Sequence, residues 1–315
     1  DAKIKSQAIK EFFLRCENIY DGTETGGGGE WWVGSGGGTD SGTGGEPLGP
    51  GNPEPCNGNG VATNPLEPNT NIGEGGCSGI PTVVTVPPIR ITPCQKLSNL
   101  LDPTKANIKP LITGGLYTAV NNAAGETGIA LKRESNGAIT NEILPYTPNP
   151  NGENPSINIK TGGSYYSSIH SHPKDAYPMF SWSDVYSLYK LEMGTASHNT
   201  MQSSFLLVCE DDSGVKQTYA IVFENTGLMM EDVMNNPENI RCTAQEIKNK
   251  MDIELKEKYD NEAKKTNPNY ERVFLQLNYG TNIGLYKANS DLTSWQKLSI
   301  NSNSDTAIVV PANCN

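Results

Sequence analysis

Two of the three histidines of the chain are separated by a single residue, in the stretch Ile169-His170-Ser171-His172-Pro173. Side chains alternate faces along an extended strand, so His170 and His172 are expected to point the same way, about 7 Å apart along the strand. Two imidazoles placed in this way can bind one metal ion. Pro173 cannot donate to a strand ladder and is expected to end the strand. The pair alone also fits two ordinary surface or hydrogen-bonded histidines.

A carboxylate completes a candidate ligand set further along the chain. The stretch Ser181-Trp182-Ser183-Asp184 precedes an apolar run that is predicted to be helical. Asp184 together with the two histidines would supply three ligands and leave a fourth position for water, which is the pattern of a catalytic zinc site. The alternative is that the Ser-x-x-Asp spacing is only an N-terminal capping box of the helix.

The combined pattern resembles the signature of the JAB/MPN metallopeptidases, also called JAMM proteases. It consists of His-Ser-His-Pro, seven further residues and then Ser-x-x-Asp. The family also requires a glutamate on an earlier strand in a Glu-x-Gly context, and Glu126-Thr127-Gly128 supplies it. The resemblance is to a bacterial-type member with a Gly-rich N-terminal extension. It covers residues 94–300 at most and is specific only around 126–131 and 168–190.

The resemblance implies a zinc-dependent peptidase or isopeptidase. Zn²⁺ would be bound by His170, His172 and Asp184, and a metal-bound water would attack the peptide or isopeptide bond. Glu126 would be the general base, unless it is only an exposed strand residue. Ser181 would donate a hydrogen bond to the developing oxyanion, or it would serve only as the helix cap. The alternative function is a catalytically inactive JAB/MPN-fold binding or structural module of a large cell-surface or toxin-type protein.

The remaining hydrophobic patterns predict the elements that position these residues. Helices are expected at 95–101, at 108–120 with a break at Gly114-Gly115, at 183–193, and from Thr243 to about residue 265. Strands are expected at 127–133, 139–146, 157–160, 164–172, 204–210, 217–223, 272–279, 283–287 and 307–310. This alternation predicts an α/β fold, and the resemblance implies a mixed curved sheet sandwiched by helices, layered as in cytidine deaminases.

Composition divides the chain into three segments. Residues 1–21 are predicted to form a short helical segment, 22–93 a Gly/Pro-rich acidic linker or extended arm, and 94–315 the metallopeptidase-like domain. Residues 22–60 hold 16 of the 33 glycines, and the net charge is −11 with no Lys or Arg from 17 to 89. No basic patch and no apolar run of 18 residues occur, so we expect neither nucleic-acid binding nor a transmembrane segment. The expected partner is a protein or peptide substrate.

Seven cysteines suggest an oxidising compartment. Cys242 and Cys314 could pair, whereas Cys209, in an apolar run, is expected to be a buried free thiol. We therefore predict an extracellular or cell-surface bacterial protein, or one part of a larger surface-attached polypeptide or assembly. The alternative is that all seven are reduced. Four cysteines flank loop-like sequence and are expected in disulfides: Cys16, Cys56, Cys77 and Cys94.

Overall fold

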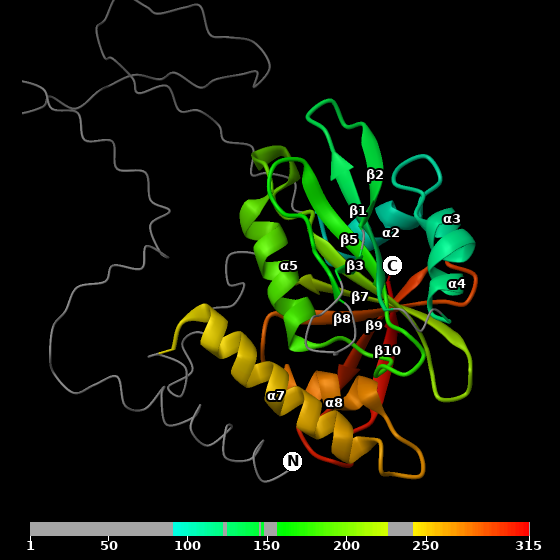
Figure 1. Ribbon diagram of the computed structural model, residues 1–315, viewed down its shortest axis with the longest axis vertical. Coiled ribbons are helices and arrows are strands. Elements are labelled where there is room, and N and C mark those ends of the chain that lie inside the picture. The colour runs from blue at the N-terminus through cyan, green and yellow to red at the C-terminus, as the bar shows by residue number, and fades with distance from the viewer. Residues whose placement is uncertain (1–90, 122–124, 145, 148–155, 226–241, 315) are drawn as a thin grey trace, which may run out of the picture. The chain divides into compact units, whose positions relative to one another are not determined.

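The computed structural model describes residues 91–121, 125–144, 146–147, 156–225 and 242–314 (Figure 1). The predictions for the helical segment 1–21, for the Gly/Pro-rich arm up to residue 90, and for Cys16, Cys56 and Cys77 lie outside the described residues. None of the helices in the described part of the chain is long and apolar enough to cross a membrane.

An eight-stranded mixed sheet forms the centre of the fold, with the strand order β10-β9-β8-β7-β6-β5-β1-β2. β5 and β6 pair in parallel, and all other neighbours in this sheet are antiparallel. β3 (Tyr146–Thr147) and β4 (Ser156–Ile157) form a separate two-stranded sheet. The eight strands are β1 (Thr127–Arg133), β2 (Ile139–Leu144), β5 (Tyr165–Ser171), β6 (Ser204–Glu210), β7 (Lys216–Phe223), β8 (Ile283–Ala288), β9 (Trp295–Ile300) and β10 (Val309–Asn313).

Helices cover both faces of the sheet (Figure 1). Alternation along β6 shows the two layers, because Phe205 and Leu207 join one buried cluster and Leu206 and Val208 join the other. The predicted mixed α/β architecture with helices around a sheet is therefore confirmed. The first cluster includes residues of α5 (Trp182–Gly194), α7 (Ala244–Glu262) and α8 (Tyr270–Leu277). The second cluster includes residues of α2 (Pro93–Leu101) and of a further helical stretch. This stretch consists of α3 (Lys109–Leu111), a π-helical turn (Ile112–Leu116) and α4 (Tyr117–Ala119).

Three local predictions were wrong, and one strand was missed. The strand predicted at 157–160 is present only at Ile157, the last residue of β4. The segment 272–279 is not a strand, because residues 272–277 belong to α8, whose N-cap Asn269 accepts a hydrogen bond from Arg272 N. Gly114-Gly115 does not break the helix at 108–120, since a π-helical turn accommodates both glycines. β9 was not predicted, because only Trp295 and Leu298 of its residues are buried and the segment lacks strict alternation.

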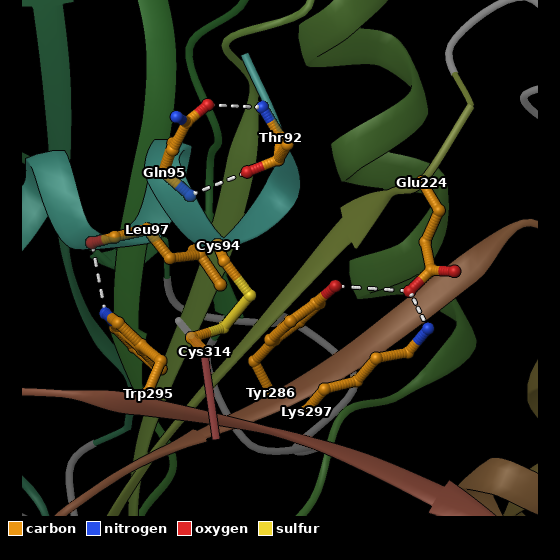
Figure 2. Close-up of a disulfide and its surroundings, with 9 residues drawn as sticks. All are labelled: Thr92, Cys94, Gln95, Leu97, Glu224, Tyr286, Trp295, Lys297 and Cys314. Atoms are coloured by element: carbon orange, nitrogen blue, oxygen red, sulfur yellow. Dashed lines mark hydrogen bonds and ion pairs between the residues drawn. A yellow bond between two sulfur atoms is a disulfide. The ribbon is translucent and has the colours of Figure 1, made fainter. Parts of the chain in front are cut away.

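A disulfide joins Cys94 on α2 to Cys314 just after β10, across 220 positions of sequence (Figure 2). Trp295 supports the same junction, because its indole Nε1 donates to Leu97 O at 3.0 Å and its carbonyl accepts from Cys314 N at 3.0 Å. The prediction that Cys94 is disulfide-bonded is confirmed. The suggested pairing of Cys314 with Cys242 is wrong, while Cys209 is a buried free thiol as expected.

Candidate metal centre

The two histidines of the candidate site lie at the end of the central strand β5. The His170 side chain is 1% exposed, between β1 and β6, where His170 is paired with Gly128 and Leu207. His172 follows the last residue of the strand, and its backbone N–H donates to Val208 O at 2.9 Å. The two ring centroids are 5.0 Å apart. The expected side-by-side arrangement of the pair is therefore present.

Backbone carbonyls define which nitrogen of each ring is available. Nδ1 of His170 lies 2.9 Å from Leu206 O, and Nδ1 of His172 lies 2.8 Å from Tyr177 O. A carbonyl oxygen can only accept, so Nδ1 of each ring is the donor, and Nε2 is the nitrogen that can present a lone pair. This is the arrangement found for metal-ligating histidines, whose second nitrogen donates to a carbonyl or a carboxylate.

The Nε2 atom of His170 is buried and has no hydrogen-bond partner among the described residues. Burial is the main cause that lowers the pKa of His170, which favours the neutral ring. A buried polar atom without a partner costs about 1–3 kcal/mol, so a native structure rarely retains one without a reason. A metal ion bound to Nε2 would satisfy it.

Glu126 comes to the same place through the antiparallel register of β1 and β5. Thr127, the first residue of β1, pairs with Ser171, the last residue of β5. Glu126 directly precedes Thr127 and His172 directly follows Ser171, so the antiparallel register brings them next to each other. Gly125 has a φ of 130°, a conformation in which L side chains are rare, directly before Glu126. Oε1 of Glu126 lies 3.8 Å from Nε2 of His172, and Oε2 accepts from Ile157 N at 3.3 Å.

Gly128, the glycine of the Glu-x-Gly pattern, has a steric role beside the site. It is the cross-strand partner of His170, so a side chain there would project to the same face as the imidazole. A Cβ atom at this position would lie 2.4 Å from Cδ1 of Ile157. The absence of a side chain at Gly128 therefore lets Ile157 pack over the strand and direct its N–H to Glu126.

Asp184 and Ser181 come from the N-terminus of α5. Oδ1 of Asp184 lies 3.4 Å from Nε2 of His170, and Oδ2 lies 3.9 Å from Nε2 of His172. Ser181 is the N-cap, and its backbone N–H and hydroxyl both donate to Oδ2 of Asp184, at 2.7 and 2.9 Å. The Ser-x-x-Asp capping box is therefore present, and its carboxylate also faces both histidines.

Within the described residues, one group of side chains could hold a metal ion: Glu126, His170 and His172, whose ligand atoms all lie within 4.8 Å of one another. The third member of this group is Glu126, whereas Asp184 was predicted from the sequence as the third ligand. Both carboxylates nevertheless face the histidines, so two imidazole nitrogens and two carboxylates surround one space. This donor set fits zinc.

The site opens into a cleft of about 600 Å³. Glu126, His172 and Ser181 line it, whereas the His170 side chain is buried. α7 also lines the cleft, with Asp252, Leu255, Lys256 and Tyr259. Lys256 is the only Lys or Arg among the lining residues of this cleft.

All five residues singled out from the sequence lie together here: Glu126, His170, His172, Ser181 and Asp184. The third histidine, His198, is exposed and its Nε2 lies 2.8 Å from Arg133 O, so it is outside the site as expected. The sequence analysis did not assign the α7 residues to the cleft. The capping box at Thr243 and the charged helix that follows predicted α7 itself, but no motif indicates which of its faces meets the site.

Comparisons with known proteins identify no relative of this chain. No family model, no curated protein and no solved structure matches it.

Proposed function

We propose that the chain is a zinc-dependent hydrolase of the JAB/MPN type that cuts a peptide or isopeptide bond. The observation that carries the proposal is the convergence of Glu126, His170 and His172 within 4.8 Å, with a buried and unpartnered Nε2 on His170. Strand pairing holds His170 and the residues next to Glu126 and His172, and helix capping holds Asp184, so the arrangement does not depend on loops alone.

In the proposed site, His170, His172 and Asp184 hold the metal. A bound zinc ion supplies a Lewis acid that activates water and polarises the substrate carbonyl. The hydrogen bonds from Ser181 to Oδ2 leave Oδ1 of Asp184 directed toward His170. Asp184 also lies at the N-terminus of α5, where the positive end of the helix dipole attracts a carboxylate.

Glu126 is the proposed general base. The Ile157 N–H binds Oε2, which leaves Oε1 beside His172 to take a proton from the attacking water and pass it to the leaving nitrogen. Glu126 also belongs to the group that could hold a metal, so its role as base or ligand needs a direct test. Replacing Glu126 and Asp184 separately provides that test.

Ser181 is the proposed oxyanion donor. Its hydroxyl donates to Asp184 and accepts from Asp184 N at 3.2 Å, so it already takes part in the capping box. To stabilise an oxyanion, the hydroxyl proton must turn from the carboxylate into the cleft, which Ser181 lines. A hydroxyl can rotate in this way without moving the backbone.

The second candidate function is an inactive module that keeps the fold and the metal but has no substrate. The extensive capping role of Ser181 and Asp184 favours it, because helix stability alone accounts for those hydrogen bonds. Metal analysis of the purified protein together with hydrolysis of a peptide library separates the two functions. Zinc without any cleavage would favour the module, and cleavage abolished by a chelator would favour the hydrolase.

We also propose that the protein is extracellular or on the cell surface of a bacterium, with a protein or peptide as its substrate. The Cys94–Cys314 disulfide is compatible with an oxidising compartment.

A further inference from the structure

The two histidines of the candidate metal centre differ in what fixes their orientation. The carbonyl that binds Nδ1 of His170 belongs to Leu206, in the middle of the sheet on β6. The carbonyl that binds Nδ1 of His172 belongs to Tyr177, in the connection between β5 and α5. A connection has fewer backbone restraints than a central strand, so the orientation of His172 depends on what holds Tyr177.

The Tyr177 side chain is held by α7 and α8. Its hydroxyl donates a hydrogen bond to Asp260 of α7. Its ring lies 5.2 Å from the ring of Tyr259 and 5.5 Å from that of Tyr270, centroid to centroid.

The same face of α7 makes two more contacts with the segment that carries the site. Tyr259 donates its hydroxyl hydrogen to Phe180 O at 2.9 Å. Asp252 accepts the backbone N–H of Ser183 at 2.7 Å, next to Asp184. Tyr259 and Asp260 come seven and eight positions after Asp252, which places all three on one side of a helix. One helix therefore holds both the connection after His172 and the start of α5.

We propose that α7 is a positioning element of the metal centre, in which the Tyr177–Asp260 hydrogen bond holds the Tyr177 carbonyl that orients His172. This inference rests on the proposed function, since it assumes that His172 is a metal ligand. Neither Tyr177 nor Asp260 is proposed to touch the metal. Outer partners of this kind typically change metal affinity about 10–100-fold when they are removed.

Two variants break the bond from its two sides. Tyr177→Phe removes the donor and keeps the ring contacts, and Asp260→Ala removes the acceptor. Both should bind zinc about 10–100-fold more weakly than the parent, measured by competition with a chromogenic chelator. Asp260→Asn keeps an oxygen that can accept from the phenol, so it should restore most of the affinity even though it also loses the ion pair with Lys256.

A matched control removes a hydroxyl from the same aromatic cluster. Tyr270→Phe leaves the Tyr177–Asp260 bond in place and should bind zinc as the parent does. Lys256→Gln removes the ion pair to Asp260, which is 2.9 Å long, and should likewise preserve the affinity.

The second readout needs no metal. Two-bond ¹H–¹⁵N correlation spectra of the zinc-free protein should show His172 protonated at Nδ1 in the parent and in Tyr270→Phe. In Tyr177→Phe and Asp260→Ala, the spectra should show a mixture of both tautomers. A fold defect would alter the His170 signals as well, whereas loss of the Tyr177 anchor should leave them unchanged.

The outcomes distinguish this inference from the proposed function. A parent that binds no zinc would contradict the proposed function, while the tautomer spectra would still test the role of α7. Unchanged His172 tautomer and unchanged zinc affinity in folded Tyr177→Phe and Asp260→Ala would overturn the positioning role. Failure of Asp260→Asn to exceed Asp260→Ala in affinity would overturn it as well, because the hydrogen-bond acceptor would then have no effect.

Discussion

Oδ1 of Asp184 lies 3.4 Å from Nε2 of His170, although the two residues belong to different elements. His170 is fixed by the parallel pairing of β5 with β6, and Asp184 by the capping box of α5. The same carboxylate thus completes a helix N-terminus and faces the one nitrogen of His170 that lacks a hydrogen-bond partner among the described residues. Because Asp184 can serve as a helix cap or as a metal ligand, the metal content of the protein is the first quantity to measure.

The first prediction concerns zinc. The purified protein should contain about one zinc ion per chain, and His172→Ala should remove it because one of the converging nitrogen ligands is lost. Elemental analysis after gel filtration measures this. His198→Ala is the matched control, since His198 is exposed and its Nε2 lies 2.8 Å from Arg133 O, outside the site. Absence of metal from the gently purified parent would show that the assignment of the site is wrong.

The second prediction separates the base from the ligand. Glu126→Gln should keep zinc and lose hydrolysis by about 10²–10⁴-fold, because the amide is nearly isosteric but cannot take a proton from water. Asp184→Ala should lose both zinc and hydrolysis. Metal content and single-turnover rates on a cleavable peptide check both variants. Loss of zinc from Glu126→Gln with retention in Asp184→Ala would make Glu126 the ligand, in agreement with the cluster within 4.8 Å.

The third prediction concerns the two roles of Ser181. Ser181→Ala should lower the free energy of unfolding by about 0.5–2 kcal/mol through loss of the N-cap. It should also lower kcat by about 10²–10³-fold if the hydroxyl stabilises an oxyanion. Urea unfolding and steady-state kinetics measure the two effects.

Thr92→Ala is the control for the cap alone. Thr92 and Gln95 form an equivalent capping box on α2, on the face of the sheet opposite α5 (Figure 2). This variant should lose similar stability and keep full kcat. Equal kcat losses in Ser181→Ala and Thr92→Ala would mean that Ser181 has no part in the reaction beyond the cap.

Much of the site could be predicted from sequence because local rules determine it. Alternation along a strand puts His170 and His172 on one face, and Ser-x-x-Asp makes a helix cap regardless of what surrounds it. Gly128 is explained only by the structure, since the atom it avoids is Cδ1 of Ile157, 29 positions later in the chain. Such contacts depend on tertiary packing and produce no periodic pattern in the sequence.

The error at 272–279 arose because this segment fits both a strand and a helix. The residues 272–279 are rich in apolar and aromatic side chains, as strands are, but Tyr270, Val273, Phe274 and Leu277 also follow helical spacing. The N-cap Asn269 and packing against α7 stabilise the helix. The role of α7 at the cleft could not be predicted, because a charged helix gives no indication of which partner its apolar side covers.

The fourth prediction concerns pH. Burial lowers the pKa of His170 below 6.5, the value for the imidazole in an unfolded chain. The unfolded chain therefore binds the proton first as the pH falls. For the zinc-free protein, the contribution of His170 to stability should be complete above about pH 6.5 and should be lost as the pH falls below it, by at most about 1.4 kcal/mol per unit.

Urea midpoints measured in the presence of a chelator, from about pH 7.5 down to about pH 5, test this prediction. His170→Gln cannot titrate in this range, so its midpoint should fall less steeply than that of the parent. Parallel curves for the two proteins would assign the acid sensitivity to other groups.

The last prediction concerns the Cys94–Cys314 disulfide. It closes a loop of 220 positions, so removing it with Cys94→Ser and Cys314→Ser together should lower the free energy of unfolding by about 2–5 kcal/mol. Urea unfolding of the parent and of the double variant measures the difference. Cys209→Ala is the control, because Cys209 is a buried free thiol and its loss leaves the cross-link intact.

Alkylation of the folded and the unfolded parent without reductant completes this test. Cys209 should be labelled only after unfolding, because it is buried, and burial raises the pKa of its thiol. Cys94 and Cys314 should resist labelling until a reductant is added. Labelling of either one without reductant would show that the bond is absent from the purified protein, and the support that the disulfide gives to an extracellular location would then be lost.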